Sequence, residues 1–282
     1  MKKTIACGTA LLVTAMTLFA GGAKEETNTS SFTGTWTFGG STTVAPIAHV
    51  VIEQFAKQHP AAKITYEGLG SSTGLKQLAE GTISLAGSSR DLKQSELDSG
   101  LVPVVVARDA LAVVVNKDIT IANLSKEELA AIFSGTITNW KQVGRKDEVI
   151  TVIVRDETSG TWGSFKEIVL DPGKLAYTRN AIVAKENGEV AAKVASTPGA
   201  IGYVGLGFVE EITKAGGKAL SINGVLPGVK TATDGTYPLS RSLYMATKGP
   251  AAEGSIQKAF LDFVLSPRGT VIVREAGFVP VK

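Results

Sequence analysis

Three short turns of glycine and hydroxyl residues each lead into a segment with helical hydrophobic spacing. Their sequences are GGSTT at residues 39–43, GSSTG at residues 70–74 and RDETSGT at residues 155–161. Apolar residues then recur three and four positions apart, as between Val44 and Phe55, which predicts a helix with one buried face. Each turn therefore precedes a predicted helix, where backbone N–H groups are unpaired and the partial charge is positive.

Turns of this kind suit a phosphate-like oxyanion, and Arg155 adds a full positive charge to the third one. Ser and Thr before a helix are also typical N-caps, so a single turn indicates little about function. Three such turns in one chain favour an anion site.

The order of apolar segments predicts an α/β fold. Short apolar runs alternate with amphipathic stretches, which is typical of strands linked by helices around a mostly parallel sheet. Valine-rich runs at residues 101–106 and 111–115 indicate strands buried on both faces. Ser125 and Glu128 form a capping-box pattern at the start of another helix. A strand at residues 149–154 ends beside Arg155, at the edge where ligands of open α/β sheets gather.

The first 23 residues have the layout of a secretory signal peptide. Lys2 and Lys3 precede an apolar run that is too short to span a membrane, and small residues follow it. Residues 24–31 are polar and lack apolar periodicity, which predicts a flexible tether. We therefore expect an exported protein.

Cysteine usage bears on covalent links and membrane anchoring. The only cysteine, Cys7, lies in the signal, so we expect no disulfide in the mature chain. A lipid anchor would need a cysteine at the cleavage point, where Gly22 stands. We expect a periplasmic protein without a lipid anchor.

Charge and residue types exclude several other functions. The chain has 29 basic and 26 acidic side chains, so no nucleic-acid partner is expected. Leu75 stands where a nucleotide P-loop needs lysine. The two histidines, His49 and His59, are far apart and suit neither a hydrolase base nor a transition-metal site. We expect no catalytic residue, metal or cofactor.

Four loop motifs in a fixed order carry a resemblance to a known family. They are GSTTVAP at residues 40–46, GSSTG at 70–74, AGSSR at 86–90 and RDETSGT at 155–161, supported by YPLSR at 237–241. With this order and spacing, the chain resembles the periplasmic phosphate-binding proteins of ABC transporters, which have the type II solute-binding fold. The resemblance covers nearly all of the mature chain.

The resemblance implies a two-lobed α/β fold in which each lobe is a mostly parallel sheet flanked by helices. One lobe would combine residues 32–108 with 241–282, and the other would hold residues 112–236. Two crossover strands near residues 107–111 and 236–241 would join them. Lobe closure around inorganic phosphate would signal to a membrane ABC permease, with the protein acting as a monomer.

The resemblance also implies a set of phosphate-binding residues. These are Ser41, Thr42, Thr43, Ser71, Ser89, Arg155, Glu157, Ser159, Gly160 and Thr161. Some family members have an aspartate in the third loop to accept the phosphate proton, but this chain has Ser89 there. Glu157 is then the expected proton acceptor. Arg90 is either a second basic partner of the anion or a residue that holds its loop.

Two alternatives remain open at this stage. The same fold could bind another tetrahedral oxyanion, such as sulfate, arsenate, molybdate or tungstate. An ionised Glu157 would favour phosphate, because a ligand without a proton gains nothing from a carboxylate acceptor. An exported phosphatase would need a nucleophile with a base or a metal cluster, and the sequence offers neither.

Overall fold

The computed structural model of the chain describes residues 32–281, which lie within a compact unit spanning Ser31–Lys282. The expected signal peptide, residues 1–23, and the tether, residues 24–31, lie outside the described residues. Among residues 32–281, no helix is both long enough and apolar enough to cross a membrane.

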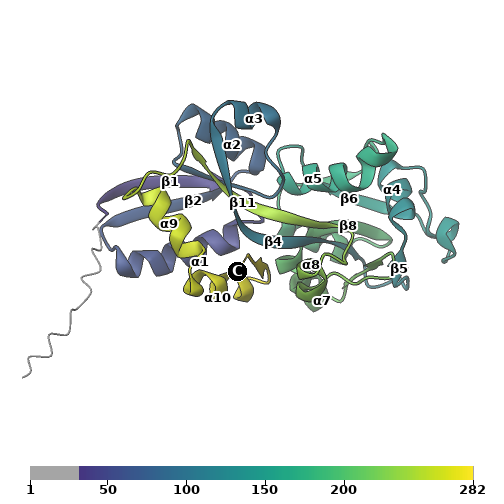
Figure 1. The fold of residues 1–282 in the computed structure, drawn as a ribbon. Coiled ribbons are helices and arrows are strands. Elements are labelled where there is room, and N and C mark those ends of the chain that lie inside the picture. Colours follow the sequence, from purple (N-terminus) through teal and green to yellow (C-terminus); the bar gives the residue numbers. More distant parts are fainter. Residues whose placement is uncertain (1–31, 282) are drawn as a thin grey trace, which may run out of the picture. The chain divides into compact units, whose positions relative to one another are not determined.

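A ten-stranded mixed sheet organises the described residues in the order β2-β1-β3-β11-β4-β8-β6-β7, with β9 and β12 also paired to β4 (Figure 1). β1 pairs in parallel with β2 and β3, and β6 pairs in parallel with β7 and β8. Antiparallel pairs join β3, β11, β4 and β8. The strands are β1 (Gly34–Gly40), β2 (Ala62–Gly68), β3 (Leu85–Ser88), β4 (Leu101–Val115), β6 (Thr151–Arg155), β7 (Ile182–Ala184), β8 (Ala200–Gly205), β9 (Lys218–Ala219), β11 (Ser240–Lys248) and β12 (Val279–Pro280), beside a separate pair of β5 (Asn123–Leu124) and β10 (Ser221–Ile222).

One long strand replaces the two valine-rich strands that the sequence predicted. β4 continues through residues 107–110 because β11 pairs with it there, placing Arg241 opposite Asp109 and Leu243 opposite Ala107. β4 and β11 thus connect two groups of elements. We call them the β1 side, residues 32–100 and 249–278, and the β6 side, residues 116–239.

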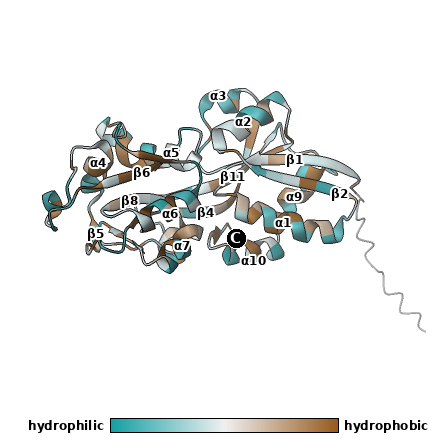
Figure 2. Ribbon diagram, turned by 180° about the vertical axis from the view of Figure 1, so that it is seen from behind, coloured by the Kyte–Doolittle hydropathy of each residue, from teal (hydrophilic) through white to brown (hydrophobic). Residues whose placement is uncertain are grey.

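Helices cover both faces of the sheet on the β1 side (Figure 1). Phe55 of α1 packs with Phe38 and Phe260 below the strands, and Leu75 and Leu78 of α2 pack in a separate cluster with β3. Figure 2 shows the largely hydrophilic colouring of α3, which has no buried residue. The helices are α1 (Ala45–Gln58), α2 (Ser71–Glu80), α3 (Gln94–Asp98), α9 (Ile256–Val264) and α10 (Pro267–Glu275).

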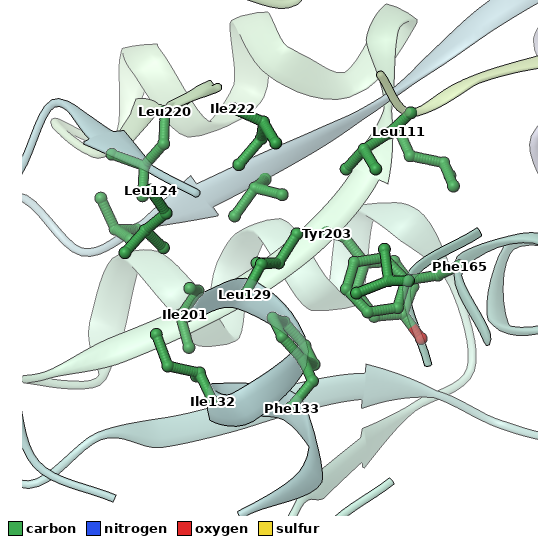
Figure 3. Packing of buried hydrophobic residues seen from close by; sticks show 14 of the residues in the cluster. Leu111, Leu124, Leu129, Ile132, Phe133, Phe165, Ile201, Tyr203, Leu220 and Ile222 are labelled. Carbon is green, nitrogen blue, oxygen red and sulfur yellow. The ribbon is translucent and has the colours of Figure 1, made fainter. Parts of the chain in front are cut away.

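The β6 side has its own core, and this core reaches the sheet edge where Arg155 lies. Figure 3 shows the ring of Phe165 against the ring of Tyr203, whose centroids are 4.0 Å apart with an interplanar angle of 11°. Phe133 packs against both rings. The helices on this side are α4 (Lys126–Ser134), α5 (Gly160–Phe165), α6 (Asn187–Ser196), α7 (Val209–Lys214) and α8 (Val229–Thr233), with short helical turns η1 (Trp140–Val143), η2 (Lys166–Leu170), η3 (Asp171–Gly173) and η4 (Leu206–Phe208).

The structure confirms the predicted helices that follow the three turns and the capping box. α1, α2 and α5 begin at Ala45, Ser71 and Gly160, so residues 71–74, which the sequence predicted as a turn, already belong to α2. At α4, the backbone N–H of Glu128 donates to Ser125 Oγ at 3.0 Å, and the N–H of Ser125 donates to Glu128 Oε2 at 2.8 Å. The α/β class predicted from the alternation of segments is therefore confirmed.

Candidate functional site

Arg155 ends β6, between its parallel neighbours β7 and β8, and its side chain lies almost entirely away from solvent at 1% exposure. Its Nε donates to the carbonyl of Ala184 at 3.3 Å, and its Nη2 donates to the carbonyl of Lys185 at 2.5 Å. Nη2 also donates to Thr42 Oγ1 at 3.1 Å, across to the β1 side. These contacts hold the guanidinium toward the first hydroxyl turn.

No carboxylate within residues 32–281 forms a salt bridge with Arg155, although this guanidinium is buried. Its Nη1 lies away from solvent and has no hydrogen-bond partner in that range. Burial lowers the pKa of Arg155; Asp156 opposes this shift, and nearby Arg241 adds to it. A buried charge without a counterion is costly, so the position favours an anionic ligand.

Two threonine hydroxyls from opposite sides meet beside Arg155. Thr43 Oγ1 and Thr161 Oγ1 are 3.0 Å apart, and both side chains are fully buried. Asn187 Nδ2 donates to Thr43 Oγ1 at 3.1 Å, and Arg241 Nη1 donates to Thr161 Oγ1 at 3.0 Å. The first and fourth loop motifs therefore lie together, although 118 positions separate these two threonines in the sequence.

The second and third loop motifs contact each other and the fourth motif through Ser71 and Ser89. The backbone N–H of Ser89 donates to Ser71 Oγ at 3.1 Å, and the two hydroxyl oxygens are 3.4 Å apart. Gly160 approaches both, because a Cβ at this position would lie 2.3 Å from Ser71 Oγ and 2.6 Å from Ser89 Oγ. A side chain at residue 160 would thus separate the loops.

Ser41 and Ser159 organise the turns in which they lie. Ser41 Oγ accepts from the backbone N–H groups of Thr43 at 3.1 Å and Val44 at 3.3 Å. Ser159 is the N-cap of α5, and its Oγ accepts from the N–H groups of Thr161 at 3.1 Å and Trp162 at 3.3 Å. Both serines are at most 2% exposed.

A buried ion pair between the two central strands borders this cluster. Arg241 Nε and Nη2 donate to Asp109 Oδ2 at 2.8 and 2.6 Å. Asp109 Oδ1 accepts from the N–H groups of Ala110 and Leu206, each at 2.8 Å. Burial lowers the pKa of Arg241, and the charge of Asp109 opposes that shift. Arg241 Nη1 also donates to the carbonyl of Ser89 at 3.0 Å, so one guanidinium contacts β4 and both sides.

Sequence reasoning missed Arg241, Asp109 and Asn187 as parts of this site. Arg241 belonged to a supporting motif without a role, and Asp109 interrupts a valine-rich strand. That interruption was a usable signal, since a charged residue in a doubly buried strand needs a partner. Asn187 carried no comparable signal, because its role depends on the packing of α6 against the loops.

The structure does not bring Glu157 into the cluster, and its expected role as proton acceptor stays a prediction. Glu157 is exposed in the turn between β6 and α5. Asp156 Oδ1 accepts from the N–H of Thr158 at 2.9 Å, which closes this turn with residue 157 at its tip. Glu157 forms no salt bridge with Arg155 or with any other residue in the range 32–281.

Arg90 holds its loop, which decides between the two roles that the sequence left open. Its Nη1 and Nη2 donate to the two carboxylate oxygens of Glu96 at 2.9 and 2.7 Å. Nη2 also donates to Ser72 Oγ at 3.1 Å. Among residues 32–281, no group of three His, Cys, Asp or Glu side chains is placed to hold a metal ion.

Comparisons with known proteins agree on what this chain resembles. Residues 25–268 match the family model described as the PBP superfamily domain. The chain is 38% identical over 249 residues to the phosphate-binding protein PstS of Borreliella burgdorferi, covering 86% of this chain and 89% of that protein. It is 35% identical over 264 residues to the phosphate-binding protein PstS of Bacillus subtilis, covering 92% of this chain and 84% of that protein.

A solved structure of a protein from Clostridium perfringens has a similar fold. That structure is assigned as a phosphate ABC transporter substrate-binding protein and contains bound phosphate. It matches with a TM-score of 0.81 and 31% sequence identity, over 88% of this chain and 100% of that one.

Proposed function

Because the chain belongs to the PBP superfamily and has the two-lobed type II periplasmic-binding-protein fold, we propose that it captures inorganic phosphate for an ABC permease. The observation that carries the proposal is Arg155, a guanidinium at 1% exposure with an unpartnered Nη1 and no salt bridge within residues 32–281. The names of the relatives support phosphate as its ligand.

We propose that phosphate is held between Arg155 and the hydroxyl-bearing loops of both sides. The proposed binding residues are Ser41, Thr42, Thr43, Ser71, Ser89, Arg155, Ser159, Gly160 and Thr161. All of these residues except Thr42 are buried, and exclusion of water strengthens each charge-assisted hydrogen bond to the anion. Glu157 is left out of the set because its side chain is exposed.

The two lobes would correspond to residues 32–108 with 241–282 and to residues 112–236, joined near residues 107–111 and 236–241. The passage of β4 and β11 between the β1 side and the β6 side supports these bounds. Closure over phosphate would present the permease with a surface that the open form lacks. The protein would perform no chemistry on its ligand and would act as a monomer.

We further propose export by residues 1–23, with residues 24–31 as a tether, and a periplasmic location without a lipid anchor because Gly22 replaces the required cysteine. Calorimetric titration of the purified mature protein with phosphate tests the proposed function. We expect saturable binding of one phosphate per chain. The absence of saturable binding at millimolar phosphate would contradict it.

Hydroxyl removal tests the placement of the anion between the lobes. Thr161→Val and Thr42→Val each keep the side-chain volume and remove a donor, one from each side. Each variant should lose about 1–3 kcal/mol of phosphate binding, because a buried anion oxygen is left short of a hydrogen bond. Calorimetry would measure both. If only one substitution weakens binding, phosphate does not contact both sides.

A second pair of variants tests closure itself. The backbone N–H of Ser72 donates to the carbonyl of Thr158 at 2.9 Å, and a Cβ on Gly70 would lie 2.6 Å from Thr158 Oγ1. Gly70→Ala should therefore hold the loops apart and weaken phosphate binding by more than about tenfold, or 1.4 kcal/mol.

Gly81→Ala is the control for a Cβ added to α2 away from Thr158. Gly81 lies at the other end of α2 with φ +77°, close to the φ of +84° at Gly70, but a Cβ there would meet no atom within 4 Å. Both positions have positive φ, but Gly70 has ψ 151° and Gly81 has ψ 15°, so Gly70→Ala also carries the larger backbone strain. Equal phosphate affinities in the two variants would show that the Gly70 contact does not govern closure.

A further inference from the structure

One helix of the β6 side packs directly on a loop of the β1 side. In α5, Gly160, Gly163 and Ser164 are three and four positions apart, so they share one face of the helix. A Cβ on Gly160 would lie 2.6 Å from Ser89 Oγ, and a Cβ on Gly163 would lie 3.0 Å from Arg90 Cδ. This face of α5 is therefore in contact with the third loop motif, which belongs to the other side.

The hydroxyl of Ser164 makes a hydrogen bond across this contact. Its Oγ donates to the carbonyl oxygen of Ser89 at 3.0 Å, and the side chain is 4% exposed. A serine inside a helix ordinarily donates to a carbonyl three or four positions earlier or to water, and the carbonyl of Gly160 lies four positions before Ser164. Ser164 donates to the β1 side instead, so this hydrogen bond exists only while the two sides are in contact.

The acceptor of this hydrogen bond has a second donor. The carbonyl oxygen of Ser89 also accepts from Arg241 Nη1 at 3.0 Å. A carbonyl oxygen has two lone pairs, so these two donors occupy it fully. Removing the Ser164 hydroxyl leaves Arg241 in place and orphans no buried carbonyl. The expected loss is then the net value of one hydrogen bond.

This contact lies on a different flank of the Arg155 cluster from the hydrogen bond between Ser72 and Thr158. Thr158 borders a cavity of about 390 Å³ whose lining includes Lys185. Ser164 borders a cavity of about 340 Å³ beside the crossover strands, and the two cavities share no lining residue. The two sides therefore meet on both flanks of the proposed phosphate site.

We propose that Ser164 is a latch residue that holds the two lobes closed over phosphate and slows phosphate release. This inference rests on the proposed phosphate function and its lobe closure. Ser164 acts through the backbone of Ser89 and not on the anion itself, so it is a positioning residue. The apparent affinity includes the equilibrium between open and closed forms, so a weaker closed form lowers the affinity without changing any contact to the anion.

Loss of the hydroxyl should appear in the dissociation rate. The hydrogen bond forms only after phosphate has entered and the two sides have met, so phosphate association does not depend on it. Ser164→Ala should speed phosphate dissociation about fivefold and weaken the equilibrium affinity by the same factor, as expected for one net hydrogen bond. The association rate constant should stay within about twofold of the wild type.

The experiment loads the mature protein with radiolabelled phosphate and follows its release by rapid filtration after addition of excess unlabelled phosphate. Calorimetry gives the equilibrium affinity, and the association rate constant follows from the two measurements. Ser196→Ala is the control, because Ser196 Oγ donates to the carbonyl of Ala192 at 2.8 Å within α6. This control removes a hydroxyl that donates within one side, so both rate constants should equal those of the wild type.

Urea unfolding of the phosphate-free proteins separates a latch from a purely structural role. In the open form the Ser164 hydroxyl returns to the carbonyl of Gly160 or to water, so the closed-form hydrogen bond does not contribute to stability there. Ser164→Ala should therefore unfold at the same urea midpoint as the wild type. A lower midpoint without phosphate would assign Ser164 a structural role and overturn the inference.

The rate measurements have their own contradicting outcomes. A dissociation rate of Ser164→Ala within about twofold of the wild type would show that the hydroxyl does not hold the lobes closed. A weaker affinity caused by slower association would place its effect in the open form, which also overturns the inference. Failure of the wild type to bind phosphate at all would instead reject the proposed function, and the latch with it.

Discussion

Replacing Arg155 with Ala should abolish measurable phosphate binding at micromolar concentrations while the protein remains folded. Arg155 is the buried cation without a salt bridge in the described part of the chain, so the variant leaves the anion without its uncompensated positive charge. Each hydrogen bond to a charged group contributes about 1.5–3 kcal/mol, and Nη1 has no hydrogen-bond partner within residues 32–281 while Nη2 donates to Thr42. Calorimetry measures the affinity, and circular dichroism checks the fold.

Arg179→Ala is the matched control, since Arg179 is an exposed arginine on the same side of the molecule. It removes the same charge without touching the cluster, and its affinity should equal that of the wild type. An Arg155→Ala affinity within threefold of the wild type, under about 0.7 kcal/mol, would place the anion elsewhere.

Asp109→Asn should cost the protein more stability than any surface substitution, about 3–5 kcal/mol of unfolding free energy. The Asp109 side chain is fully buried, and it is the carboxylate that pairs with Arg241 between β4 and β11. Its loss leaves a buried guanidinium without a counterion. Urea unfolding followed by circular dichroism would measure the change.

The double variant Asp109→Leu with Arg241→Met separates the effect of the buried charges on stability from the effect of side-chain packing. Replacing both members of a buried ion pair by apolar residues is often neutral or stabilising, so the double variant should recover much of the loss. If Asp109→Asn unfolds at the same urea concentration as the wild type, the pair does not hold the crossover strands together.

The sequence was enough to predict the α/β class and the helices at the turns, because these depend on local pattern. Arg155 was identified as a ligand-binding residue because it stands at the carboxyl end of a predicted strand. Ligands of open α/β sheets bind at that edge. The family resemblance supplied the pairing of loops that lie more than a hundred residues apart.

Features that depend on strand register and turn closure could not be predicted. Arg241 meets Asp109 because β11 pairs with β4 in one particular register, and the two apolar runs of β4 join for the same reason. The exposure of Glu157 follows from the side-chain cap that Asp156 makes in its turn. Neither contact leaves a periodic signal in the sequence.

A crystal structure of the mature protein grown with phosphate tests the central claim most directly. We expect one phosphate enclosed between the two sides, within hydrogen-bond distance of Arg155 Nη1 and of the Thr43 and Thr161 hydroxyl pair. A pocket of about 340 Å³ lies beside the crossover strands, and its lining includes Arg241 together with Arg108, Glu167 and Tyr244. Phosphate bound there, with the Arg155 cluster free of it, would contradict the account.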